Sequence, residues 1–257
     1  MFDTLRHSLQ ARSRAAVATA ERGLQRMMVA WVLLVAVACG VRVATSPTAG
    51  APASGTWLGY LLICAAPVGT MAAGLRFFGR EPNLGSRAAQ ADAARYRPVA
   101  VGQALRHPAY GPSGIMVTLL AGLLISIALR TFAYLAALPA LAADVPAWLS
   151  TLQFALTVDV VLFSSLYALA FAAALRCAPV FPILLAAIWV GDLTMQLGMS
   201  AFVADRPDLP DTVRMALRHL IDGNIAKVII SAALWMPYLL LSTRVNITYR
   251  RRISADC

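Results

Sequence analysis

Six runs of mostly apolar residues alternate along the chain with shorter segments that carry most of its charge. A helix needs about 20 apolar residues to cross the hydrocarbon core of a bilayer, and each run is close to that length. The pattern therefore predicts an all-α, polytopic membrane protein with six transmembrane helices. The predicted spans are residues 28–46, 57–77, 114–138, 152–176, 179–203 and 224–243.

Composition excludes an ordinary soluble domain. Hydrophobic residues make up 60% of the chain and charged residues 13%, whereas the wetted surface of a soluble protein needs more charge. The longest gap between spans, residues 78–113, is too short to build a sizeable core of its own. Most of the chain is therefore expected to lie in the membrane.

The arginines fall mainly on one side of the predicted spans. They are frequent in residues 1–27, in residues 78–113 and after residue 243, while the first two loops on the other side are nearly uncharged. Positive charge is retained in the cytoplasm, so both termini are predicted to be cytoplasmic. The third outer loop, residues 204–223, fits this rule least, since its arginines are balanced by aspartates.

The net charge of +10 belongs to this topology signal, because the basic residues flank the apolar spans. The basic residues do not alternate regularly with aromatic residues, so nucleic acid is not expected as a partner. The expected partner is the anionic inner leaflet of the bilayer. Arginine supplies 21 of the 22 basic residues, which together with abundant alanine is typical of a GC-rich bacterial genome and indicates a bacterial inner membrane.

No cofactor or metal is expected. The three histidines are far apart and lie outside the spans, so a haem held between membrane helices is not indicated. The four cysteines form no C-x-x-C pair, and disulfides are not expected.

Breaks in the apolar pattern divide the chain into five segments. Residues 1–27 carry a partial apolar stripe and are predicted to form a basic cytoplasmic helix on the membrane surface. The connector is predicted to be a helical hairpin, whose first helix runs from Ser86 to Tyr96 and whose second begins at Pro98 and ends before Pro108. The segments are 1–27, the two-helix extension 28–77, the cytoplasmic connector 78–113, the four-helix membrane domain 114–249 and the basic tail 250–257.

Two local features add to this division. Asp211–Asp222 is predicted to be a short interfacial helix, capped by Asp211 and ended by Gly223. Ala36–Cys39 (A-V-A-C) fits a loose lipoprotein cleavage site, although the basic leader before it is long for a signal peptide. A retained helix is the interpretation we favour, and the mass of the mature N-terminus decides between the two.

Four ionisable residues lie within the predicted spans: Arg130, Asp159, Asp192 and Lys227. Each costs about 2.5–3.5 kcal/mol or more at a helix centre, so a partner is expected. All four are predicted to lie in the outer half of the membrane as a neutral cluster, with Gln196 one turn from Asp192. The alternatives are a structural ion pair, a substrate or proton pathway, and snorkelling of Arg130 and Lys227 to the outer headgroups.

Span six carries the most distinctive sequence, W-x-P-Y followed by S-x-R-V-x-x-T. Pro237 is expected to kink this helix. The motif resembles the ending of a bacterial inner-membrane family, the domain of unknown function numbered 2569. The resemblance covers roughly 109–252 as four helices and implies a fold without an activity. Its matching positions are Trp235, Pro237, Tyr238, Ser242, Arg244, Val245 and Thr248.

The chain shows no catalytic motif, neither H-E-x-x-H nor G-x-S-x-G nor a phosphate-binding loop, so no catalytic residue is predicted. The sequence favours a non-enzymatic scaffold or accessory subunit, in a homo-oligomer or larger complex, packed through small residues such as Ser164, Ala168 and Ala172. The alternative is a transporter or channel for a small solute or proton that uses the intramembrane aspartates.

Overall fold

A computed structural model describes residues 2–47, 51–78, 96–98, 103–104, 107–205 and 209–254 of the chain. Six of its helices are long and apolar enough to cross a membrane, and they follow the predicted spans in order. The prediction of a helical chain with six candidate membrane spans is confirmed. The described elements are α1 (Phe2–Thr45), α2 (Ser54–Phe78), β1 (Tyr96–Pro98), α4 (Ile115–Ala137), α5 (Ala147–Leu175), α6 (Phe181–Ala204), α7 (Asp211–Leu241), α8 (Thr243–Tyr249) and β2 (Arg252–Ser254).

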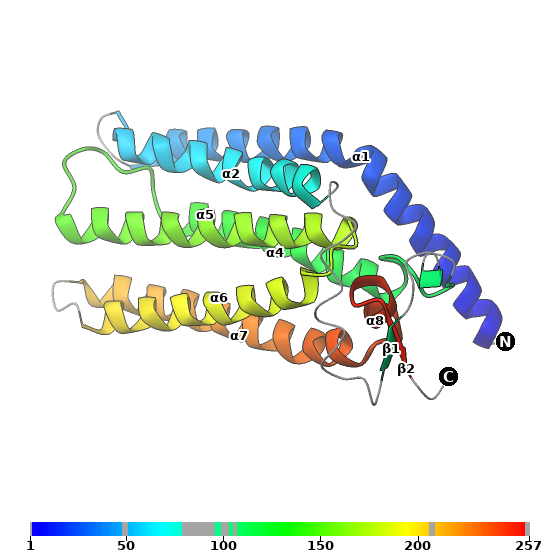
Figure 1. Cartoon of the computed structure of the whole chain (residues 1–257). Coiled ribbons are helices and arrows are strands. Elements are labelled where there is room, and N and C mark those ends of the chain that lie inside the picture. The colour runs from blue at the N-terminus through cyan, green and yellow to red at the C-terminus, as the bar shows by residue number, and fades with distance from the viewer. Residues whose placement is uncertain are drawn as a thin grey trace.

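The six long helices form three layers of two (Figure 1). Helices α1 and α2 make one layer, α4 and α5 the middle layer, and α6 and α7 the third. Helix α5 packs against α2, α4 and α6, and its buried face is rich in alanine between Ala168 and Ala174. The middle layer therefore holds the other two together.

Small residues allow α2 and α5 to approach closely. A Cβ atom placed on Gly74 of α2 would lie 3.0 Å from Ala172 Cβ and 3.0 Å from Leu169 Cδ1 of α5. A Cβ on Gly59 would lie 3.3 Å from the Thr157 methyl group. This packing places the first two spans against the domain that was predicted to follow them.

Two helices are longer than predicted. Helix α1 runs from Phe2 to Thr45, so the helix predicted over residues 1–27 is present and continues directly into the first span. Helix α7 runs from Asp211 to Leu241, so the short helix ending at Gly223 is wrong. A Cβ on Gly223 would meet nothing within 4 Å, and a helix tolerates an interior glycine for about 1 kcal/mol. The N-cap residue of α7 is Pro210, not Asp211.

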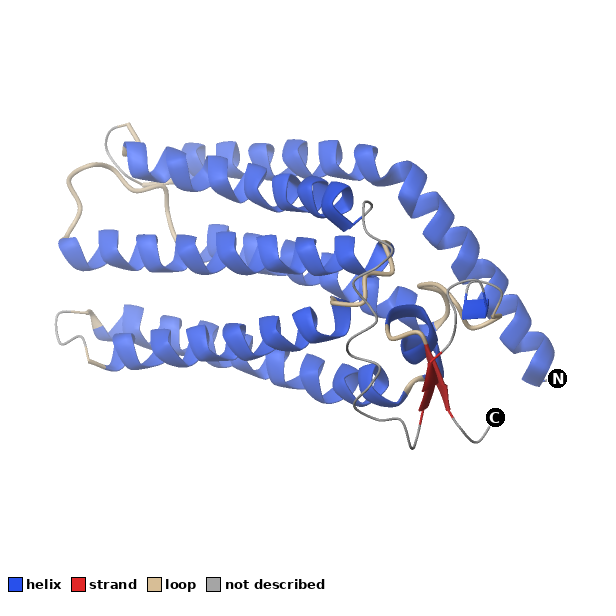
Figure 2. Cartoon of the chain, viewed as in Figure 1, coloured by secondary structure: helices blue, strands red, loops and turns tan. Residues whose placement is uncertain are grey.

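One end of the bundle, the α8 end, carries the two strands and the short helix α8 (Figure 2). Strand β1 pairs with β2 in antiparallel register, with Arg97 opposite Ile253. The sequence pattern predicted a helical hairpin for Tyr96–Pro98. That prediction is wrong, because these residues form a paired strand. Extended backbone is expected before Pro98, because proline disfavours helix at the preceding residue. Residues 79–95, 99–102 and 105–106 lie outside the described residues, and with them most of the two predicted helices of the connector.

Large apolar side chains cover the outer faces of the bundle. Leu33 and Val37 of α1, Phe154 of α5, and Leu234 and Leu241 of α7 are each more than 60% exposed. A soluble protein rarely leaves so many large apolar side chains in water, whereas lipid tails solvate them. The exposed faces thus agree with the hydropathy of the spans.

Candidate functional site

Arg130 of α4 lies between two aspartates from the neighbouring helices. Its Nη1 donates to Asp159 Oδ2 of α5 at 2.8 Å, and its Nη2 donates to both carboxylate oxygens of Asp192 of α6 at 2.6 Å. The exposed fractions of the side chains are 10% for Arg130, 4% for Asp159 and 1% for Asp192. One guanidinium therefore links three helices through buried, charge-assisted hydrogen bonds.

Three further side chains complete what we call the Arg130 network. Gln196 Nε2 donates to Asp159 Oδ1 at 2.9 Å, and Tyr167 Oη donates to Asp192 Oδ2 at 2.9 Å. The ring of Phe163 lies 5.0 Å from the guanidinium carbon of Arg130, in a cation–π arrangement. The structure thus brings Arg130, Asp159, Asp192 and Gln196 together, as the sequence suggested.

Phe163 and Tyr167 were not among the predicted site residues. They follow Asp159 at four and eight positions, so all three share one face of α5. This spacing was the available signal. It was hidden because an aromatic residue on a buried helix face is ordinarily a core residue.

The network lies near the middle of its helices. Asp159 and Asp192 are close to the midpoints of α5 and α6, and Asp159 is still in the N-terminal half of α5, which was predicted to be the outer half. Helix α5 begins at Ala147, five residues before the predicted span, so Asp159 lies farther from the start of its helix than predicted. Neither carboxylate is near a helix end, so snorkelling would not bring them to the headgroups.

Lys227 does not bind to the network. Its Nζ donates to Asn224 Oδ1 of the same helix at 3.3 Å. Since α7 extends back to Asp211, Lys227 is also near the middle of its helix rather than three residues from the outer end. The predicted neutral cluster of two positive and two negative residues is therefore incomplete in the structure.

Lys227 and the network line the same half-open cavity of about 330 Å³, which we call the polar cavity. It lies between α4 and α7, and Tyr167 and Asp192 reach it from α5 and α6. A water molecule occupies about 30 Å³ of liquid and needs two to four polar partners, so the cavity has room and partners for several. Its polar lining includes Ser126, Arg130, Tyr167, Asp192, Asn224, Lys227 and Ser231.

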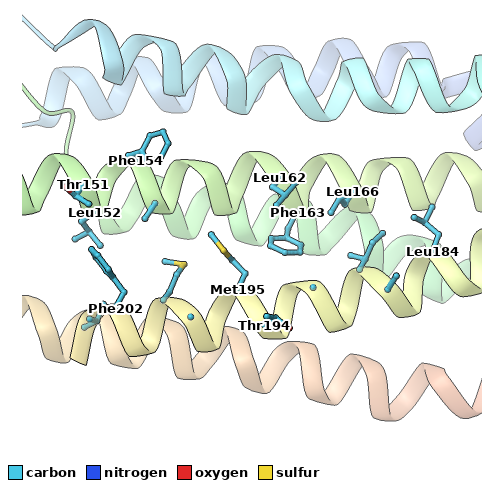
Figure 3. A pocket seen from close by; sticks show the side chains of 17 residues that line it. Thr151, Leu152, Phe154, Leu162, Phe163, Leu166, Leu184, Thr194, Met195 and Phe202 are labelled. Atoms are coloured by element: carbon cyan, nitrogen blue, oxygen red, sulfur yellow. The ribbon is translucent and has the colours of Figure 1, made fainter. Parts of the chain in front are cut away.

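A larger apolar groove of about 770 Å³ lies between α5 and α6 (Figure 3). Phe163 of α5 and Met195 of α6 point into it from opposite walls. Phe163 also stacks on Arg130, so this ring stands between the apolar groove and the guanidinium. The groove carries few polar atoms and offers no groups for chemistry.

The motif at the end of span six divides between two helices. Trp235 and Tyr238 stack edge to face in α7, with ring centroids 5.9 Å apart, and Pro237 lies between them inside the helix. Ser242 ends α7 and forms the N-cap of α8, and Val245 is fully buried. These residues shape the turn from α7 into α8.

The rest of the motif ties α8 to the loop before α4. Arg244 Nη1 donates to the Gly111 carbonyl at 3.3 Å and to the Ser113 hydroxyl, and Gly111 N donates to Thr248 Oγ1 at 3.0 Å. Gly111 and Gly114 have φ of 95° and 70°, which glycine adopts without strain. The motif residues thus fix one end of the bundle and lie away from the Arg130 network.

Tyr249 closes the α8 end. Its hydroxyl donates to the Ala174 carbonyl at 3.0 Å, and its ring lies 5.0 Å from that of Phe181. Burial raises the pKa of the Tyr249 phenol well above its ordinary value. Burial, and then the nearby Cys177, also raise the pKa of Tyr110 in the adjacent loop.

No metal site is found in the described part of the chain, where no group of three or more His, Cys, Asp or Glu side chains converges. The network instead offers two carboxylates, one guanidinium and a tyrosine hydroxyl.

Together, the six apolar helices and the buried charged network define the class of a multi-pass helical membrane protein. Compared with models of known protein families, with curated proteins and with solved structures, the chain has no match. The resemblance of residues 109–252 to the family of unknown function therefore stays an expectation.

Proposed function

We propose that this chain is a non-enzymatic carrier or channel for a proton or a small polar solute in a bacterial inner membrane. The polar cavity is its binding site. The observation that carries the proposal is the position of this cavity, which reaches Arg130, Asp192 and Tyr167 near the middle of the helices. Ionisable groups beside a cavity at that depth are typical of substrate and proton pathways.

The cavity beside the network also indicates a role for these buried charges other than packing. An ion pair that only locks helices together needs no space beside it and is often replaceable by apolar residues of similar volume. Here the carboxylate of Asp192 faces polar space on one side and Phe163 covers the guanidinium on another. This arrangement supports a binding role more than a packing role.

Flux into proteoliposomes tests the proposal. Wild-type protein is expected to move protons or a small solute, and Asp192→Asn is expected to lose the flux at least tenfold. Asp144→Asn, in an exposed loop, is the matched control and is expected to leave the flux unchanged. Equal flux in wild-type and Asp192→Asn proteoliposomes would contradict the proposal.

A scaffold or accessory subunit is the second candidate. It is supported by the close approach of α2 and α5 at Gly74 and by the long apolar faces of α1 and α7, which could bind another membrane protein or a second copy. Purification in mild detergent followed by native mass spectrometry tests it. A partner or an oligomer is expected, and a monomer alone would contradict it.

We further propose that both termini are cytoplasmic, next to the anionic leaflet. The arginine distribution supports this orientation. The pairing of β1 with β2 supports it as well, because the segment after the second span and the segment after the sixth must then lie on one side.

A further inference from the structure

The charges of the Arg130 network do not balance. Two carboxylates, Asp159 and Asp192, share a single guanidinium. If both were ionised, the buried group would carry a net charge of about −1, which low-dielectric surroundings strongly disfavour. Such a site becomes neutral either by a nearby cation or by taking up a proton.

No second cation contacts the carboxylates in the described part of the chain. The charged and titratable groups that face them are Arg130 from α4, Tyr167 from α5 and, across the polar cavity, Lys227 from α7. Tyr167 is a neutral hydrogen-bond donor, and Lys227 Nζ binds Asn224 instead. The network therefore lacks one positive charge.

The two aspartates differ in how well they are stabilised as anions. Asp192 accepts hydrogen bonds at both oxygens from Arg130 Nη2 and a further one from Tyr167. Asp159 accepts one from Arg130 and one from Gln196. Because hydrogen bonds to the charged form favour that form, the proton is expected on Asp159.

The hydrogen bonding of Gln196 also supports a proton on Asp159. Its Oε1 is buried and has no hydrogen-bond partner in the described structure, while its Nε2 donates to Asp159 Oδ1. A half-turn of the side-chain amide would place Oε1 next to Asp159, where it accepts from a protonated carboxyl group. Gln196 can thus bind Asp159 in either protonation state.

We propose that the Arg130 network binds one proton at neutral pH and holds it on Asp159. One H⁺ from water converts the Asp159 carboxylate to a carboxylic acid, which brings the charge of the network from −1 to 0, and release reverses the change. This proton site adds detail to the proposed function. It rests on that function only for the path of the proton, since water in the polar cavity would carry the proton to the network.

Infrared spectroscopy of the purified full-length protein at pH 7 tests the inference, because a protonated carboxylic acid has its own C=O stretching band. Wild type is expected to show this band, and Asp159→Asn to lose it. Asp192→Asn is also expected to lose it, because Arg130 and Asp159 then form a balanced pair. Arg130→Gln, if it folds, is expected to double the band, and Asp144→Asn to leave it unchanged.

Three results would overturn the inference. One is a wild-type spectrum without the band, and another is a band that survives in Asp159→Asn or Asp192→Asn. The third is a band that appears only in Lys227→Gln, which would show that Lys227 already balances the network. The infrared band does not depend on transport. If the band is present but proteoliposomes show no flux, the proposed function is refuted and the inference of a bound proton is not.

Discussion

Hydrogen bonds between distant residues hold the two polar regions of this protein. At the network, Arg130 joins side chains from three helices. At the α8 end, Tyr249 reaches a carbonyl of α5, and Arg244 reaches the loop before α4. In both places a buried polar group has a specific partner, as buried polar groups require.

Tyr249 gives a prediction on pH. Its folded-state pKa is raised by burial, so the stability that this raised pKa represents is present below the unfolded-state pKa of 10.0 and is lost as the pH rises above that value. The slope contributed by one such group approaches about 1.4 kcal/mol per pH unit. Unfolding in detergent, followed from roughly two pH units below the ordinary tyrosine pKa to about one unit above it, measures this slope.

The comparison is with Tyr249→Phe, which keeps the ring against Phe181 and removes the ionisable hydroxyl. The variant is expected to be less stable at neutral pH, because the Ala174 carbonyl loses its hydrogen bond with Tyr249. Its stability should then fall less steeply with pH. Identical slopes in the two proteins would refute the assignment.

At the scale of elements, hydropathy predicted the six spans because lipid imposes one length and one composition on each of them. Helix ends outside the lipid were predicted less well. Gly223 was predicted to end a helix, but α7 continues through it. Tyr96–Pro98 forms a strand because it pairs with Arg252–Ser254, which is far away along the chain. Local sequence carries no information about such a distant partner.

The charged residues of the site were predictable from the sequence, and their neighbours were not. Asp159, Asp192 and Arg130 stand out because a charge in a span needs a partner. Tyr167 does not stand out, because its role depends on Asp192 of the next helix. Lys227 was grouped with the others by its charge alone, and its place in the lining of the polar cavity depends on how α7 packs.

The contact between α2 and α5 gives a prediction at this scale. Gly74→Ala places a Cβ 3.0 Å from two side-chain atoms of α5, so the helices must move apart. We expect a loss of about 1–3 kcal/mol, as for overpacking in a core. Gly69→Ala in the same helix is the control, because its Cβ would meet nothing within 4 Å.

Thermal or denaturant unfolding in the same detergent measures both variants. Alanine is favoured over glycine in a helix by about 1 kcal/mol, so Gly69→Ala should be as stable as wild type or more so. Equal behaviour of the two variants would show that α2 and α5 do not approach closely at Gly74.

At the scale of the whole molecule, the even number of spans brings the start of α1 and strand β2 to the same end of the bundle, where β2 pairs with β1 (Figure 1). The layer of α1 and α2 and the layer of α6 and α7 both pack on the middle layer of α4 and α5. The charged network lies between the second and third layers, where a small shift of α6 relative to α5 would change its hydrogen bonds.

Reporter fusions test the orientation. A reporter active only in the cytoplasm should be active when fused after residue 257 or inserted near residue 90, and inactive near residue 50 or residue 144. This outcome follows from the arginine-rich segments staying inside. Activity near residue 50 and none after residue 257 would reverse the assignment.

The strand pair at the α8 end also fixes an order of assembly. A ribosome makes β1 long before β2, and at about 5–20 residues per second the interval is roughly 8–30 s. During that time the four further spans α4, α5, α6 and α7 are made and inserted while the Tyr96–Pro98 segment has no partner. Completion of this end is therefore a late step of biogenesis, and a nascent chain stalled before Arg252 would expose an unpaired strand edge to the cell's quality-control proteases.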